Sequence, residues 1–208
     1  MRILVADDHI VVRRGLRMIL LEGFPGAEIE EVGDAEDLIK LALKFKYDVV
    51  ISDLSMPGRS GLDALVQVKQ TKPDLPFLIL SIHPEDQYAI RVLKAGASGY
   101  LSKDMAPDEL VNAVQKVLLG KKYITASIAE KLASVFDSDK DKALHEYLSD
   151  REFGVLKMLA AGKSVSEIAE SLFLSVTTVS TYRARIITKM NLKNNAELTL
   201  YAIENKLI

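Results

Sequence analysis

Residues 48–53 read Asp48-Val49-Val50-Ile51-Ser52-Asp53, a short apolar run that ends in a carboxylate. An equally short run, Ile3-Leu4-Val5-Ala6, is followed directly by Asp7 and Asp8. Apolar runs of this length are typical of buried parallel strands. Because ligands bind at the carboxyl ends of the strands in an open α/β sheet, we expect both runs to deliver acidic groups to one functional edge.

The three carboxylates expected at this edge belong to Asp7, Asp8 and Asp53. Held close together, they repel one another unless a cation balances their charge. Hard divalent cations such as Mg2+ prefer oxygen ligands of this kind. The sequence therefore predicts a Mg2+ site formed by these acids.

The chain has 208 residues, of which 49% are apolar and 27% charged, and this balance predicts a globular protein with one large or two modest domains. It contains no cysteine, which excludes disulfides, thiolate metal sites and a cysteine nucleophile. The N-terminal stretch lacks an apolar segment long enough for a signal peptide, and no later run is long enough for a membrane span. We therefore expect a cytoplasmic protein.

Strand and helix patterns alternate through the first 120 residues. Such alternation predicts βαβ units and an α/β fold with a parallel sheet. The expected strands are Ile3–Ala6, Glu28–Val32, Val49–Ser52, Phe77–Ser81 and Gly99–Leu101. The expected helices lie near residues 9–21, 35–45, 61–71, 86–95 and 106–119.

The rest of the chain is expected to be helical. An amphipathic helix near 124–136 precedes a charged stretch, 137–142, which has few apolar side chains to bury and marks a linker. Ser149 and Glu152 have the spacing of a capping box. The helices expected after it lie near 150–161, 165–172, 176–190 and 195–205. We therefore divide the chain into a domain at 1–120, a linker at 121–147 and a small all-α domain at 148–208.

Residues 1–120 resemble the receiver domain of bacterial two-component response regulators. The resemblance rests on side chains at the ends of the expected strands, which are Asp7, Asp8, Asp53, Ser81, Tyr100 and Lys103. It implies a flavodoxin-like sheet of five parallel strands in the order 2-1-3-4-5. It also implies that a histidine kinase or a small phosphodonor phosphorylates Asp53.

The resemblance assigns the metal and the chemistry to four of these positions and to Ser55. Asp8, Asp53 and the backbone carbonyl of Ser55 would hold Mg2+, with Asp7 acting through bound water. Asp53 would be the phosphoacceptor that attacks phosphorus. Lys103 would bind a phosphoryl oxygen with its ammonium group.

The resemblance also implies a switch next to this site. Ser81 would donate a hydrogen bond to the phosphoryl group, and Tyr100 would fill the space that Ser81 leaves. His9 and His83 flank the site, and we interpret both as ordinary loop residues rather than as ligands or bases. Ile82 stands where many receivers have a small residue, so we expect it to slow the access of small phosphodonors and water.

Residues 148–208 resemble the LuxR/NarL-type helix-turn-helix output domain over its full length. The motif includes Leu148-Ser149-Asp150-Arg151-Glu152, Ser166-Glu167-Ile168-Ala169 and Thr178-Val179-Ser180-Thr181-Tyr182. In helix-turn-helix proteins the second helix of the motif lies in the major groove, and here that helix is 176–190. The resemblance therefore predicts a DNA-binding domain.

Helical periodicity divides 176–190 into two faces. Val179, Ile186 and Met190 share the face expected to be buried. The other face and its flanks carry no acid, and the predicted DNA contacts are Thr177, Ser180, Thr181, Arg183, Ala184, Arg185, Thr188 and Lys189. Relatives often have a basic residue where Thr177 stands, so we expect one phosphate contact to be missing.

These features predict a transcription factor controlled by phosphorylation, rather than an enzyme. An Asp-nucleophile phosphohydrolase would need a second acid two residues after the nucleophile, where this chain has Ser55. The other alternative is a degenerate receiver that acts without phosphorylation. The complete set of Asp8, Asp53, Ser81 and Lys103 favours the functional receiver over it.

The resemblance also implies a homodimer on activation, because family members usually bind pseudo-palindromic DNA as dimers. The helix at 9–21 carries Arg13, Arg14 and Arg17, whereas the helix at 106–119 carries Asp108 and Glu109. These opposite charges make a dimer through the two helices a hypothesis.

Overall fold

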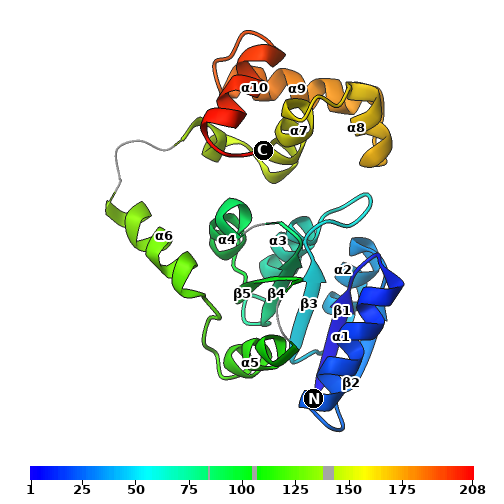
Figure 1. Cartoon of the computed structure of the whole chain (residues 1–208). Coiled ribbons are helices and arrows are strands. Elements are labelled where there is room, and N and C mark those ends of the chain that lie inside the picture. Colours follow the sequence, from blue (N-terminus) through cyan, green and yellow to red (C-terminus); the bar gives the residue numbers. More distant parts are fainter. Residues whose placement is uncertain (84, 105–106, 138–142) are drawn as a thin grey trace. The chain divides into compact units, whose positions relative to one another are not determined.

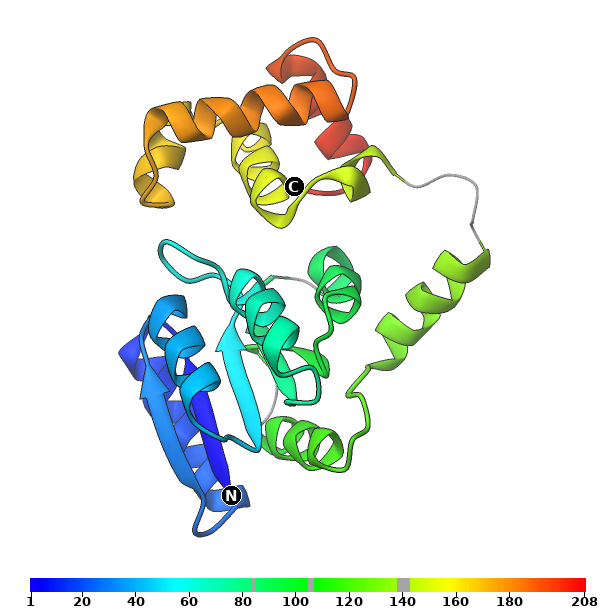
Figure 2. The same ribbon diagram turned by 180° about the vertical axis from the view of Figure 1, so that it is seen from behind.

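The structure is a computed structural model that describes residues 1–83, 85–104, 107–137 and 143–208. The chain divides into two compact units, Met1–Ser134 and Val135–Ile208, which Figures 1 and 2 show from opposite sides. Among the described residues, no helix is long and apolar enough to cross a membrane. Positions 138–142, which make up most of the charged stretch 137–142 within the predicted linker, lie outside the described residues.

A parallel sheet of five strands forms the core of the first unit. The strands are β1 (Arg2–Ala6), β2 (Glu28–Val32), β3 (Val49–Asp53), β4 (Phe77–Ser81) and β5 (Gly99–Ser102). They lie in the order β2-β1-β3-β4-β5, which confirms the predicted fold. Every residue of β3 and β4 is buried, as expected for interior parallel strands. Because Ala6 pairs with Ser52 and Asp53 pairs with Leu80, the carboxyl ends of β1, β3 and β4 lie side by side.

Helices cover both faces of this sheet. On one face, α1 (Ile10–Gly23) and α5 (Pro107–Leu118) pack on alternate residues of β1 and β3. The other face carries α2 (Ala35–Lys44), α3 (Gly61–Thr71) and α4 (Glu85–Lys94), as Figure 2 shows. The expected helices are confirmed with ends that differ by one or two residues, which is the usual fraying of helix termini.

The start of the predicted linker packs on the first unit. The N–H of Tyr123 donates to Ser98 O over 2.8 Å, which adds a single bridge beside β5. Tyr123 OH donates to Glu109 Oε1 over 2.6 Å, and Thr125 Oγ1 donates to Glu85 Oε2 over 2.8 Å. These bonds fix the beginning of α6 (Ala126–Asp137) to α4, α5 and the edge of the sheet.

The second unit is a small helical domain. Its elements are η1 (Leu144–Tyr147), α7 (Asp150–Ala160), α8 (Val165–Ser171), α9 (Val176–Lys189) and α10 (Asn195–Glu204). Ser149 and Glu152 form the predicted capping box at the start of α7, and Ser164 and Glu167 form a second one at the start of α8. The sequence pattern does not predict the short 3-10 turn η1.

Candidate functional site

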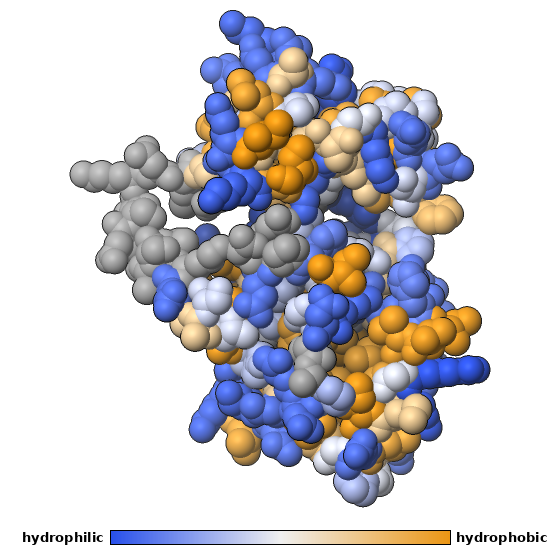
Figure 3. All heavy atoms as spheres, viewed as in Figure 1, coloured by the Kyte–Doolittle hydropathy of each residue, from blue (hydrophilic) through white to orange (hydrophobic). Residues whose placement is uncertain are grey.

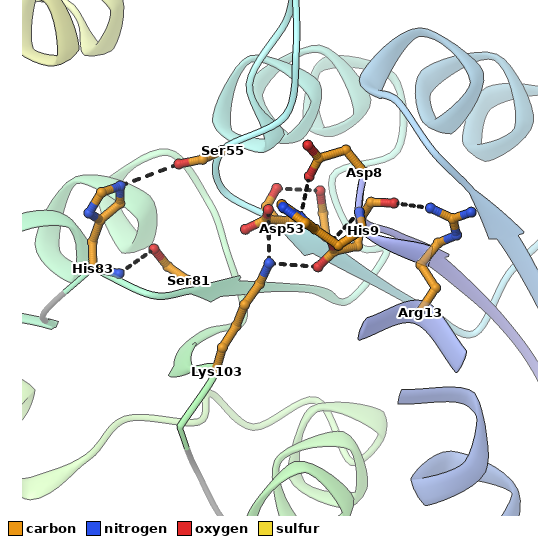
Figure 4. Close-up of polar contacts among 10 residues, drawn as sticks. Asp8, His9, Arg13, Asp53, Ser55, Ser81, His83 and Lys103 are labelled. Carbon is orange, nitrogen blue, oxygen red and sulfur yellow. Dashed lines mark hydrogen bonds and ion pairs between the residues drawn. The ribbon is translucent and has the colours of Figure 1, made fainter. Parts of the chain in front are cut away.

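The ends of three strands bring two acids and a lysine into direct contact. Asp7 follows β1, Asp53 ends β3 and Lys103 follows β5. Lys103 Nζ lies 2.7 Å from Asp7 Oδ2 and 2.9 Å from Asp53 Oδ2, as Figure 4 shows. Both carboxylates are buried, so a single ammonium group offsets only one of two negative charges that water screens poorly.

The surroundings shift the pKa values of two of these groups. Burial raises the pKa of Asp53, the ion pair with Lys103 opposes this rise, and the Asp7 carboxylate adds to it, so that the pKa stays above its ordinary value. For Lys103, burial lowers the pKa, but the ion pairs with Asp7 and Asp53 outweigh burial and raise it overall. Lys103 is therefore charged at neutral pH, and it stabilises the negative charge on Asp53.

Oxygen atoms at the same place fit a divalent metal ion. One ligand atom from each of Asp7, Asp8, His9 and Asp53 lies within 4.8 Å of the others. Asp8 Oδ1 is buried and lies 2.9 Å from His9 Nδ1, although the pair does not have the geometry of a hydrogen bond. Three carboxylates held this close repel one another unless a cation balances their charge. Their oxygens therefore suit a hard cation such as Mg2+, which prefers oxygen ligands.

His9 has contacts that its interpretation as an ordinary loop residue does not predict. Its Nδ1 lies 2.9 Å from Asp8 Oδ1 and 3.3 Å from Asp7 Oδ1. Its backbone N–H also donates to Asp7 Oδ1 over 2.9 Å. The position of His9 directly after the acidic pair is the sequence signal that indicates this proximity. The imidazole is thus part of the cluster around the acids.

Ser55, whose carbonyl is a predicted metal ligand, lies in the loop after β3. A hydrogen bond from the Ser55 backbone reaches Asp53 and lowers the pKa of Asp53, opposing the larger effect of burial. The loop is closed by Gly61, whose N–H donates to Leu54 O over 2.9 Å. A side-chain carbon at Gly61 would come within 1.9 Å of Asp53 O. Only glycine therefore lets this loop return so close to the acid.

Two arginines of α1 stabilise the loop that carries the acids. Arg13 Nη1 donates to Asp7 O over 2.5 Å, and Arg17 Nη1 donates to Ile29 O over 2.9 Å. Both guanidinium groups lie 3.7 Å from carboxylate oxygens of Glu31 on β2. The structure therefore uses these arginines inside the unit. Their predicted contact with α5 of a second copy stays a prediction.

Ser81 and Tyr100 both form hydrogen bonds to the backbone of His83. Ser81 Oγ accepts from His83 N–H over 3.0 Å, and Tyr100 OH donates to His83 O over 2.8 Å. Burial raises the pKa of Tyr100 to about 12, so its hydroxyl remains a donor. The ring of His83 reaches Ser55 Oγ at 3.4 Å, as Figure 4 shows. His83 thus connects the two predicted switch residues with the loop beside Asp53.

The two faces of α9 are arranged as its periodicity predicts. Val179, Ile186 and Met190 are buried in the second unit. The residues on the opposite face are exposed, and they are Thr177, Ser180, Thr181, Ala184, Arg185 and Thr188. Figure 2 shows α9 as the long orange helix of this unit. The face predicted to approach DNA is therefore open to solvent within the unit.

Two basic side chains predicted to contact DNA already bind other side chains. Arg183 Nε donates to Asn195 Oδ1 over 2.7 Å, and Lys189 Nζ donates to Glu152 Oε2 over 2.6 Å. Within the described part of the chain, Arg185 forms no hydrogen bond or ion pair. Arg185 is therefore the cation of this face that is ready to bind an external group.

Comparison with known proteins assigns both units to families. The model of the response regulator receiver domain matches residues 3–115, and the model of bacterial regulatory proteins of the luxR family matches residues 146–202. The chain belongs to the luxR-family response regulators. This response regulator is accordingly a DNA-binding transcription regulator of the two-component type.

Two curated relatives match the response regulator over nearly its whole length. Response regulator UvrY of Escherichia coli (strain K12) is 39% identical, with 99% of this chain and 94% of the relative covered. Response regulator GacA of Pseudomonas aeruginosa is 35% identical, with 100% and 97% covered. A solved structure of RcsB from Salmonella enterica serovar Typhimurium, bound to promoter rprA in the presence of phosphomimetic BeF3-, is 28% identical with a TM-score of 0.64. That comparison covers 97% of this chain and 98% of the other.

Proposed function

We propose that a cognate histidine kinase phosphorylates this response regulator on Asp53, and that phosphorylation controls its binding to DNA in the cytoplasm. Asp8, Asp53 and the Ser55 carbonyl would hold Mg2+, with Asp7 acting through bound water. When bound, the metal would offset the repulsion between the phosphoryl donor and the carboxylate. The observation that carries the proposal is the contact of Lys103 with Asp7 and Asp53, at a place where the carboxylates of Asp7, Asp8 and Asp53 gather within 4.8 Å of one another.

The transfer itself requires a free oxygen on Asp53. In the proposed step this oxygen forms a bond to phosphorus while the bond between phosphorus and the imidazole nitrogen of the kinase breaks, and the electron pair stays on that nitrogen. The Lys103 ammonium group then moves from the Asp53 carboxylate to a phosphoryl oxygen. Its flexible side chain allows this movement while the contact with Asp7 is kept. Asp53 becomes an acyl phosphate, and the negative charge then lies on the phosphoryl oxygens instead of on the carboxylate.

The change spreads through His83. When the Ser81 hydroxyl turns toward the phosphoryl group, it loses the hydrogen bond that Ser81 Oγ accepts from His83 N–H. Because Tyr100 OH also donates to His83 O, a movement of His83 then acts on the buried side chain of Tyr100. Ser81 and Tyr100 are therefore the proposed switch residues, and α4 is the element that they displace.

A homodimer follows from the recognition of pseudo-palindromic DNA, whose two halves require two copies of α9. Ile10, Val11 and Met18 are exposed on α1, and Figure 3 shows apolar side chains gathered over this helix. Exposed apolar patches of this kind often mark protein interfaces. The α1 face is therefore the proposed dimer surface, and phosphorylation raises the fraction of dimer.

Intact mass measurement tests the proposal. The full chain is incubated with Mg2+ and acetyl phosphate, and a phosphoryl adduct is expected. The adduct should be absent from Asp53→Asn and present in Asp74→Asn, a variant of an exposed acid in a loop. No adduct in the wild-type chain would identify a degenerate receiver, whereas continuous release of phosphate without an adduct would identify a phosphohydrolase.

A further inference from the structure

The face of α9 that is proposed to enter the major groove has unusual chemistry for base recognition. The side chains that read bases with two hydrogen bonds are arginine, lysine, asparagine and glutamine. This face instead offers short hydroxyl and methyl groups, and Arg185 is its one basic side chain. Arg183 and Lys189 at its flanks are held by Asn195 and Glu152. Most of the sequence information must therefore come from the short side chains.

Thr181 turns its hydroxyl away from any base. Its Oγ1 donates to Thr177 O over 2.9 Å, one helical turn back along α9. The only hydroxyl proton of Thr181 is thereby used within the helix. Of the two branches on its β-carbon, the methyl group is the one left for an external contact. An exposed threonine that appears polar in the sequence is thus an apolar contact in the structure.

Ala184 extends the apolar surface that Thr181 begins. Residues three apart are neighbours on a helix surface, and both side chains are exposed. Along the helix axis they are separated by about 4.5 Å, which is close to the spacing of roughly 3.4 Å between base pairs. Two methyl groups therefore face neighbouring base pairs if α9 lies in the major groove.

The major groove presents one apolar group that matches such a surface, the C5-methyl group of thymine. Guanine, cytosine and adenine present only hydrogen-bonding groups there, and a methyl group cannot satisfy them. The neighbouring Ser180 has a free hydroxyl, since it forms no hydrogen bond within the described part of the chain. The Ser180 hydroxyl can form a hydrogen bond with either base of a pair, so its contact is compatible with the bases that the two methyl groups select.

We propose that Thr181 and Ala184 are the specificity-determining residues of α9 and that they read the methyl groups of thymines at neighbouring base pairs of each half-site. The proposal rests on the proposed function, because it assumes that α9 lies in the major groove. It predicts A·T pairs at these two positions. It also predicts that the thymine methyl group, rather than a hydrogen bond, is the feature recognised.

The first experiment selects bound duplexes from a random pool with the full chain, Mg2+ and acetyl phosphate present. Selected duplexes that share two neighbouring A·T pairs in each half-site are the expected result. Selected duplexes with no A·T preference would overturn the methyl proposal while leaving the proposed function intact. Failure to enrich any sequence would instead count against the DNA-binding function itself.

The second experiment replaces one thymine of a selected site by deoxyuridine, which removes only the C5-methyl group. Because one buried methyl-sized group contributes about 0.8 kcal/mol, the wild-type chain should bind the deoxyuridine duplex roughly fourfold more weakly. Thr181→Ser has lost its own methyl group, so its affinities for the two duplexes should differ by less than about twofold. Equal affinities of the wild-type chain for every deoxyuridine duplex would overturn the proposal.

Thr181→Val is the matched control, since it keeps a methyl group at the same place and removes the hydroxyl. It should retain the fourfold preference for thymine, on the order expected for one methyl contact. A loss of the preference in this variant would show that the hydroxyl is the recognised group, and would overturn the proposal. Circular dichroism of each variant establishes that α9 is folded before binding is compared.

Discussion

Lys189 Nζ on α9 lies 2.6 Å from Glu152 Oε2 at the start of α7, and the Glu152 side chain is only 3% exposed. The same carboxylate oxygen accepts hydrogen bonds from the N–H and the hydroxyl of Ser149. Glu152, which the sequence predicts only as part of a helix cap, therefore also joins α7 to the recognition helix α9. This ion pair links the stability of the DNA-binding unit to the placement of α9.

Replacement of Glu152 by glutamine is expected to destabilise the second unit by about 1.5–3 kcal/mol, because hydrogen bonds to a charged, buried group are worth that much. The cap at Ser149 can persist through the amide oxygen, but the ion pair with Lys189 is lost. Urea unfolding of the full chain measures the effect. Glu167→Gln, in the exposed capping box of α8, is the matched control and should cost much less. Similar losses in the two variants would contradict the role of the ion pair.

The stability contributed by Glu152 should depend on pH in the acid range. Burial alone would raise its pKa, but Lys189 and Ser149 outweigh burial and lower the pKa of the folded state below the ordinary value of 4.5. The stabilisation is therefore fully present above pH 4.5 and is lost as the pH falls through the lower folded-state pKa. Unfolding measurements at a series of pH values should show the gap between wild type and Glu152→Gln narrowing in this window. A constant gap would rule this explanation out.

Lys103→Met should strengthen the binding of Mg2+ and weaken phosphorylation. Without the ammonium group, Asp7 and Asp53 lose their positive partner and attract a cation more strongly. The phosphoryl group also loses a cation that would stabilise it, so less adduct should form. Titration calorimetry with Mg2+ and intact mass with acetyl phosphate measure the two effects. Weaker Mg2+ binding in the variant would show that Lys103 supports the metal site instead.

Ile82→Ala should speed the reaction with a small phosphodonor. The Ile82 side chain is 69% exposed directly after the buried Ser81, where we expect a bulky group to narrow access to Asp53. We expect a rate increase on the order of threefold, or roughly 0.7 kcal/mol of activation free energy. The time course of the acetyl phosphate adduct measures it. Val66→Ala, an exposed apolar position on α3, is the control. The same rate in wild type and Ile82→Ala would show that Ile82 does not limit access to Asp53.

Thr177→Lys should make DNA binding depend more steeply on salt. Thr177 is exposed at the start of α9, on the face that is proposed to approach DNA. One added phosphate contact changes the slope of log affinity against log salt by about one unit. Titrations of one duplex at several salt concentrations measure the slope. An unchanged slope would show that position 177 does not reach the backbone.

Arg17→Glu should lower the fraction of dimer in the phosphorylated protein. The Arg17 side chain is 43% exposed and lies beside the apolar residues of α1, whereas that of Arg13 is 16% exposed and holds Asp7 O. Of these two arginines, Arg17 is therefore the one whose replacement leaves the contact with Asp7 O in place. Light scattering after treatment with acetyl phosphate measures the dimer. Lys40→Glu on α2 is the control. Equal dimer fractions in wild type, Arg17→Glu and Lys40→Glu would contradict the proposed interface on α1.

The sequence by itself determined the order of elements, the parallel sheet and the acids at its edge. Each of these follows from local information, because side-chain periodicity and the residues at strand ends act over a few positions of the chain. The buried face of α9 and the capping box at Ser149 and Glu152 follow from the same short-range rules. The family resemblance then supplied the roles of these residues.

Only the tertiary structure decided which partners these side chains have. Arg13 binds the Asp7 carbonyl, His9 joins the acidic cluster and Lys189 binds Glu152, although none of these contacts has a periodic signature. The reason is physical. Each contact depends on the distance between elements that pack together, and a long flexible side chain can satisfy several alternatives until packing selects one.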